Sequence, residues 1–178
     1  MAISLNGGML KFIKGTTPAE NKISLLEAKP DGVSSQLEMI LVNTNKARNS
    51  KSTIEAVMRL RDTDNAKFTQ VMTEMGETTS RVLEIYQGSD SKEVLAELLK
   101  LISRNHVLLR DLGVSCDEIE RIVDTLDHLG GCNTKLTGAG GGGCVIGFKS
   151  RETKPDSDEA RKKLEEAGFS IFEGIQNS

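Results

Sequence analysis

The feature that most constrains this chain is the run KLTGAGGGGCV at residues 135–145, which places five glycines among the six residues 138–143. Glycine loses more conformational freedom on folding than any other residue, roughly 0.5–1 kcal/mol per position relative to alanine in a regular element. Consecutive glycines also let several backbone N–H groups converge on an anion, or let another loop approach without hindrance from a Cβ atom. The run therefore indicates a loop with a specific structural or binding role.

Three known phosphate-loop patterns do not account for this run. A Walker loop needs Lys and Ser or Thr after its last glycine, but Cys144 and Val145 follow Gly143. Residues 138–143 match G-x-G-x-x-G, yet the dinucleotide fold needs a strand before the loop and a helix after it, and here the order is reversed. The protein-kinase glycine loop G-x-G-x-x-G-x-V also matches, but none of the other kinase motifs follows.

Two interpretations of the run stay open on the residues alone. In the first, its N–H groups bind an anion, helped by the positive charge of Lys135 and the hydroxyl of Thr137. In the second, the run is a flexible linker or a tight connection between a helix and a strand.

Composition and charge exclude several classes of protein. The 178 residues carry a formal charge of −3, without a basic block or the aromatic residues of a base-stacking surface. No apolar run approaches the ~20 residues of a membrane helix. The cysteines, Cys116, Cys132 and Cys144, form no CxxC pair and indicate reduced thiols. We therefore expect a soluble, cytoplasmic protein with no nucleic-acid and no membrane partner.

The hydrophobic pattern predicts an α+β fold. Short apolar runs predict strands at residues 9–13, 23–26, 37–42, 144–148 and 169–172. Apolar residues at three- and four-residue spacing predict helices at residues 50–60, 64–88, 92–113 and 115–129, and a charged surface helix at 156–167. This order favours a sandwich in which helices pack on one face of a mainly antiparallel sheet.

Residues 132–144, CNTKLTGAGGGGC, resemble the third motif of the GHMP small-molecule kinases in the form found in mevalonate kinases. Three other segments resemble the same family in the expected order: residues 2–10, 41–50 and 102–114. The resemblance spans essentially the whole chain but only the C-terminal half of the family. It implies a GHMP-kinase C-terminal domain at residues 37–178, preceded at 1–36 by a β segment that continues from an N-terminal domain.

The resemblance also implies where the chemistry would lie. The family's catalytic aspartate would precede Met1, and its P-x-x-x-G-L-G-S-S phosphate loop is not in this sequence. We therefore expect a fragment that is inactive alone and has no catalytic residue of its own. The parent kinase would use ATP and Mg²⁺ to phosphorylate mevalonate, with the Mg²⁺ ligands in the N-terminal half. As partners we expect that half or a second copy of this chain.

The resemblance assigns binding roles to two groups of residues. Arg48 would face the mevalonate carboxylate, and Ser50, where the family has threonine, would orient the transferring phosphate. Ala47 stands where a proline is common, and Lys46 lies one position later than the family's lysine. The phosphate region would be lined by Thr137, Gly138, Ala139, Gly140, Gly141, Gly142 and Gly143.

Two alternative functions remain. The chain could belong to a GHMP kinase for phosphomevalonate, homoserine or a sugar, or it could be a non-catalytic assembly module that keeps the loop as a connector. His106 and His128 lie in helical patterns without a nucleophile motif and are interpreted as packing or surface residues. The acidic residues of the helix at 115–129 are interpreted as a solvated face: Asp117, Glu118, Glu120 and Asp124.

Overall fold

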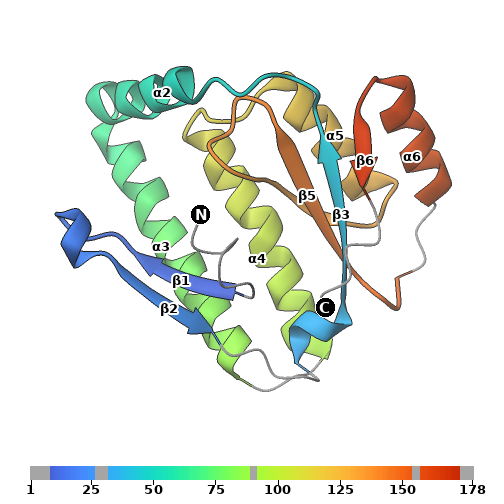
Figure 1. The fold of residues 1–178 in the computed structure, drawn as a ribbon, viewed down its shortest axis with the longest axis horizontal. Coiled ribbons are helices and arrows are strands. Elements are labelled where there is room, and N and C mark those ends of the chain that lie inside the picture. Colours follow the sequence, from blue (N-terminus) through green and yellow to red (C-terminus); the bar gives the residue numbers. More distant parts are fainter. Residues whose placement is uncertain (1–8, 27–31, 89–91, 154–156, 173–178) are drawn as a thin grey trace.

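The structure is a computed structural model that describes residues 9–26, 32–88, 92–153 and 157–172. The expected turn at residues 29–31, the helix cap at 89–91 and the family-like segment at 2–8 lie outside the described residues. Within the described part, a four-stranded sheet packs against helices, and a separate two-stranded hairpin crosses in front of α3 in the view of Figure 1.

The four-stranded sheet has the order β4-β5-β3-β6, and all its neighbouring strands are antiparallel. Its strands are β3 (Leu37–Asn43), β4 (Asn133–Leu136), β5 (Cys144–Ser150) and β6 (Ser170–Phe172). In the register, Val145 of β5 pairs with Val42 on one side and with Leu136 on the other. The mixture of helices with an antiparallel sheet confirms the predicted α+β class.

Five helices accompany the sheet in the described part of the chain. They are α2 (Ser50–Thr63), α3 (Asn65–Gln87), α4 (Lys92–Asp111), α5 (Asp117–His128) and α6 (Ser157–Glu166). Asp64 separates α2 from α3 and caps α3, because its carboxylate accepts a hydrogen bond from the Lys67 N–H at 3.0 Å. Gly113 ends α4 with φ of +78°, as expected for a left-handed cap.

The main core lies between one face of the sheet and the helices. Burial alternates along β4 and β5, so that Thr134 and Leu136, and likewise Val145 and Gly147, face inward. The buried residues of this cluster are Val42, Val71, Leu108, Leu112, Val114, Ile119, Ile122, Leu126, Cys132, Leu136, Val145, Leu164 and Phe169. A second, smaller cluster joins the η2 turn (Val33–Gln36) to α3 and α4 through Val33, Ile85, Leu95 and Leu98.

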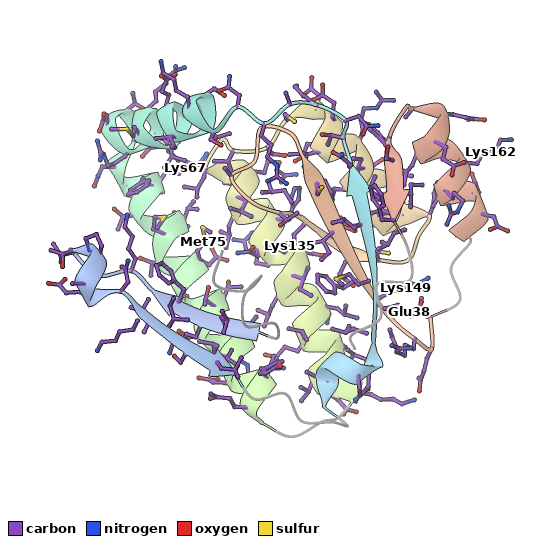
Figure 2. The ribbon with its side chains drawn as sticks, viewed as in Figure 1. Glu38, Lys67, Met75, Lys135, Lys149 and Lys162 are labelled. Carbon is purple, nitrogen blue, oxygen red and sulfur yellow. The ribbon has the colours of Figure 1, made fainter. Side chains whose placement is uncertain are left out.

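A charged pair lies on the inner face at one end of the sheet. Glu38 of β3 and Lys149 of β5 are partners in the register, and the Lys149 Nζ lies 3.3 Å from a Glu38 carboxylate oxygen (Figure 2). The glycine loop lies at the opposite end of these strands, where β5 begins. One end of the sheet therefore carries a charged pair, and the other end carries the glycine loop.

The N-terminal hairpin consists of β1 (Met9–Ile13) and β2 (Lys22–Leu26), which pair antiparallel with each other. Three of its apolar side chains, Phe12, Ile23 and Leu25, are more than half exposed. In the described residues the hairpin does not join the four-stranded sheet. The expected division of the chain at residue 36 stays a prediction.

β4 is the strand that the sequence pattern did not indicate. It has four residues, Asn133–Leu136, of which only Leu136 is apolar, so that burial alternates along the strand but polarity does not. It is an edge strand, and α4 packs along it, so that the Asn133 side chain donates to the Ser103 hydroxyl at 2.9 Å. Tertiary contacts rather than local propensity therefore hold it in place.

Candidate functional site

The loop between β4 and β5 contains the glycine run and adopts a conformation that other residues rarely reach. Its five glycines all have positive φ, at +80°, +82°, +68°, +134° and +79° for Gly138, Gly140, Gly141, Gly142 and Gly143. The α-helical and β regions available to other L-residues lie at negative φ. The backbone conformation alone therefore accounts for much of the glycine content.

The middle of the loop packs against the turn between α4 and α5. The Gly141 N–H donates to the Val114 carbonyl at 2.9 Å. A Cβ atom at Gly140 would lie 2.0 Å from that same oxygen, which is impossible without displacing the backbone. Sequence reasoning missed this contact, because a carbonyl group leaves no signature in the residue type that carries it.

The end of the loop packs against the segment that leads from β3 to α2. The Thr44 N–H donates to the Gly143 carbonyl at 2.8 Å, and the Gly143 N–H donates to the Lys46 carbonyl at 3.3 Å. In Figure 1 this segment and the loop lie at the same end of the sheet. The structure thus brings together the two segments that the sequence singled out, residues 44–50 and 137–143.

Arg48 lies across the loop. A Cβ atom at Gly143 would lie 2.2 Å from its Nε, and one at Gly138 would lie 3.4 Å from its Nη1. The Arg48 side chain is exposed, and it makes no hydrogen bond or ion pair with the residues that the structure describes. Its guanidinium donors therefore stay open toward solvent, next to a loop whose lack of side chains makes room for them.

The N-terminus of α2 borders the same space. Asn49 caps this helix by accepting a hydrogen bond from the Ser52 N–H at 3.1 Å, and Ser50 is its first residue. A Cβ atom at Gly141 would lie 2.9 Å from the Thr53 methyl group and 3.9 Å from the Asn49 nitrogen. A helix N-terminus carries a partial positive charge, so this arrangement favours an anion at the loop.

Several polar groups of the loop are not used within the described structure. The hydrogen bonds among the described residues include the N–H groups of Thr137, Gly141 and Gly143, but not those of Gly138, Ala139 and Gly142. These donors, the Arg48 guanidinium and the N-terminus of α2 are the groups that an anionic ligand requires.

Two neighbouring residues of the 44–50 segment hold it in position. Asn45 has a φ of +55°, unusual for a residue other than glycine, and its amide donates to the Gly168 carbonyl at 2.8 Å and to the Ser170 hydroxyl at 3.0 Å. Lys46 forms an ion pair of 2.7 Å with Glu118, whose pKa is lowered to about 2 chiefly by this hydrogen bond. Both residues attach the segment to the C-terminal part of the fold.

Lys135, labelled in Figure 2, directly precedes the two residues, Leu136 and Thr137, that lead into the glycine loop. It lies on β4, and burial lowers its pKa, so that the charged form is disfavoured there. In the described part of the chain no three His, Cys, Asp or Glu side chains gather in a group that could hold a metal ion. These residues therefore do not fit a Mg²⁺ site by themselves.

The two histidines differ in their surroundings. His128 is exposed on α5, whereas His106 is 3% exposed and contacts Glu120. The expectation of a solvated acidic face is therefore wrong for Glu120, which accepts a hydrogen bond from the Ser115 hydroxyl and lies beside the imidazole. The turn at 113–116 brings Ser115 back over α5, which a helical pattern alone does not reveal.

A pocket of about 340 Å³ lies away from the loop, between η2, the start of α4 and the end of β5. Leu95 and Leu99 form an apolar wall, and Lys92 and Glu152 pair across the surface at 2.8 Å. The loop adjoins the other end of both α4 and β5. This pocket is therefore separate from the candidate site.

The described residues contain no helix that combines the length and the apolar character needed to cross a bilayer. All three cysteines are free thiols, and Cys132 is buried in the main core.

The comparison with protein families agrees with this geometry. Residues 91–170, which include α4, α5, the glycine loop and β5, match the family described as "GHMP kinases C terminal". The chain belongs to the GHMP kinase family, and it carries the C-terminal domain of that family. The family resemblance noted in the sequence is thereby confirmed.

Curated relatives include mevalonate kinases from several organisms. The chain is 35% identical over 185 residues to the mevalonate kinase of Saccharomyces cerevisiae, and this alignment covers 93% of this chain and 40% of that protein. It is 31% identical over 143 residues to mevalonate kinase ERG12 of Gibberella zeae, which covers 78% of this chain and 28% of that protein. The chain thus spans less than half the length of either relative.

Solved structures share the fold. The crystal structure of L. major mevalonate kinase in complex with R-mevalonate matches with a TM-score of 0.76 and 22% identity, over 97% of this chain and 50% of that chain. The structure of Streptococcus pneumoniae phosphomevalonate kinase in complex with phosphomevalonate and AMPPNP matches with a TM-score of 0.61 and 16% identity, over 89% and 44%. At these identities the likeness concerns the fold and does not choose between the two substrates.

Proposed function

We propose that this chain supplies the C-terminal side of the active site of an ATP-dependent mevalonate kinase. The observation that carries the proposal is the contact between Arg48 and the glycine loop, at Gly138 and Gly143. It joins the segment assigned to mevalonate with the segment assigned to phosphate. The named relatives support the choice of substrate.

In this proposal Arg48 binds the mevalonate carboxylate through its exposed guanidinium, whose planar fork suits a carboxylate. Ser50, at the positive end of α2, orients the phosphoryl group as it is transferred. The unused N–H groups of Gly138, Ala139 and Gly142 stabilise negative charge on the phosphates. Phosphoryl transfer depends mainly on such positioning and neutralisation.

ATP is the phosphate donor that the family implies, and Mg²⁺ would accompany it. Because the described residues offer no metal cluster, we assign the Mg²⁺ ligands and the catalytic base to the part of the relatives that this chain does not span. We further propose a cytoplasmic location, because three free thiols suit a reducing compartment.

Association with that other part, or with a second copy of the chain, stays a proposal. Several large apolar side chains are exposed, and such patches drive association when they are contiguous. They include Phe12, Ile13, Ile23 and Leu25 of the hairpin, Ile54, Met58 and Met72 of α2 and α3, and Phe172 of β6.

The substrate is tested with a hybrid kinase in which this chain replaces the matching segment of the Saccharomyces cerevisiae relative. ADP release is measured with mevalonate, phosphomevalonate, homoserine and galactose in parallel. We expect release with mevalonate and at least tenfold less with the others. Galactose has no carboxylate and would leave Arg48 unpaired, whereas phosphomevalonate and homoserine keep a carboxylate but differ from mevalonate in the rest of the molecule. Activity on phosphomevalonate alone would favour the alternative kinase, for which the shared fold of the phosphomevalonate kinase is the supporting observation.

A further inference from the structure

His106 is the buried titratable group that the proposed chemistry does not use. It lies on α4 with 3% of its surface exposed. Its Nδ1 lies 3.3 Å from the backbone nitrogen of Leu136 on β4, and its Nε2 lies 3.1 Å from a carboxylate oxygen of Glu120 on α5. One imidazole therefore joins three elements of the fold.

These contacts fix the protonation state of the ring. A backbone N–H can only donate, so the Nδ1 that faces Leu136 must be unprotonated and must accept. The proton of the neutral ring then lies on Nε2, where it is donated to the Glu120 carboxylate. Both nitrogens are satisfied only in this neutral tautomer.

The partners of both ring nitrogens connect His106 to the glycine loop. Leu136 is the last residue of β4, and Thr137 opens the loop. On the other side, Glu120 also accepts from the Ser115 hydroxyl, and Ser115 follows Val114, whose carbonyl receives the Gly141 N–H. The loop is thus connected to His106 at its entry and at its middle.

We propose that neutral His106 is a positioning residue that holds the glycine loop in its binding geometry, and that protonation of His106 releases the entry of the loop from β4 onward. Protonation would place a second N–H on Nδ1, directly facing the Leu136 N–H, and two donors cannot share a hydrogen bond. We call the contacts of His106 with Leu136 and Glu120 the latch. An effect of the latch on catalysis rests on the proposed function, whereas the contacts themselves concern only this chain.

The charged groups around the ring act in opposite directions. Burial disfavours the imidazolium and is the largest effect, Glu120 and Asp127 of α5 favour it, and Arg110 of α4 disfavours it. The net result is that the pKa of His106 lies below its ordinary value of 6.5. Geometry and electrostatics therefore favour the same neutral form at neutral pH.

This shift predicts how stability depends on pH. The unfolded chain takes up a proton at His106 below about pH 6.5, whereas the folded chain does so only at lower pH. The contribution of His106 is therefore fully present above pH 6.5 and is lost as the pH falls below it. Asp127 acts oppositely, because burial raises its pKa from 3.8 and its contribution is lost as the pH rises through the raised value.

The latch is tested by NMR on the 178-residue chain without any substrate. At pH 7.5 the ¹⁵N signals of His106 should report the tautomer with the proton on Nε2. As the pH falls, the amide signals of Leu136 and of Gly138–Gly143 should move with the titration of His106. The protection factor of the Leu136 amide, which is the exchange rate of an unfolded amide at the same pH divided by its own, should fall at least about tenfold, as expected for loss of one buried hydrogen bond. This titration needs no substitution and so does not depend on the folding of a variant.

A matched pair of variants separates the latch from simple packing. In His106→Asn the side-chain oxygen can take the place of Nδ1 and accept from Leu136, whereas in His106→Gln the amide can reach Glu120 but not Leu136. Asn leaves the larger cavity, so it should cost more unfolding free energy than Gln. Protection of the Leu136 amide should follow the opposite order, and the Asn variant should lose the pH response of the loop.

Any of three results would overturn the inference. These are a proton on Nδ1 at pH 7.5, amide signals of the loop that do not shift as His106 titrates, and equal protection of the Leu136 amide in the His106→Asn and His106→Gln variants. Failure of the hybrid kinase to phosphorylate mevalonate would refute the proposed function and leave these measurements intact.

Discussion

Gly140→Ala is expected to lower the free energy of unfolding of this chain by about 2–3 kcal/mol. An alanine at its φ of +82° costs roughly 1–2 kcal/mol from left-handed backbone strain. The new Cβ would also lie 2.0 Å from the Val114 carbonyl oxygen, so the loop must move and lose the Gly141 hydrogen bond, at about 1 kcal/mol more. Urea unfolding followed by circular dichroism measures the change.

Two other glycines provide the controls for this prediction. Gly168 has a φ of +83° but open space around its Cβ position, so Gly168→Ala should show the backbone strain alone. Gly76 lies inside α3 with nothing within 4 Å, and Gly76→Ala should stabilise the chain by about 0.5–1 kcal/mol. If Gly140→Ala costs no more than Gly168→Ala, the loop does not depend on its contact with Val114.

Arg48→Ala is expected to reduce the kcat/KM of the hybrid kinase for mevalonate roughly 100-fold. Hydrogen bonds to charged groups contribute about 1.5–3 kcal/mol each, and 1.4 kcal/mol corresponds to a factor of ten. Because the carboxylate of mevalonate is bound in both ground and transition states, most of the loss should appear as a higher KM. Steady-state kinetics with varied mevalonate measure the split between KM and kcat.

The size of the Arg48 effect is judged against two further variants. Arg48→Lys keeps the charge but loses the planar fork, and should fall between wild type and alanine, at roughly tenfold. Arg59 is an exposed arginine on the same helix as Ser50 without a described contact to the loop, so Arg59→Ala should leave the kinetics unchanged. Equal effects of Arg48→Ala and Arg59→Ala would remove Arg48 from the site.

Much of the fold was predictable because it follows from hydrophobic periodicity. β1 coincides with the expected strand at 9–13, and α3 begins after the Asp64 cap indicated by the sequence. β4 was not predicted, because its four residues carry little local preference and depend on pairing with β5 and on packing against α4. Short edge strands of this kind are determined by contacts between distant segments.

The candidate site was predictable only in part. Residue types pointed to Arg48 and to the glycine run, and the structure brings these two together. The Val114 carbonyl and the positive φ of Asn45 were not foreseen, since both are properties of the backbone. His106 was interpreted as a packing residue, and only the positions of Leu136 and Glu120 reveal that both ring nitrogens are engaged.

The most direct test of the central proposal is mevalonate-dependent ADP release by this chain mixed with the N-terminal segment of the Saccharomyces cerevisiae relative. The proposal predicts release by the mixture, none by either component alone, and a strong reduction when the chain carries Arg48→Ala. Release by this chain alone would contradict a site that is shared between the two parts. Release by the mixture that Arg48→Ala leaves unchanged would contradict the role of Arg48 at the glycine loop.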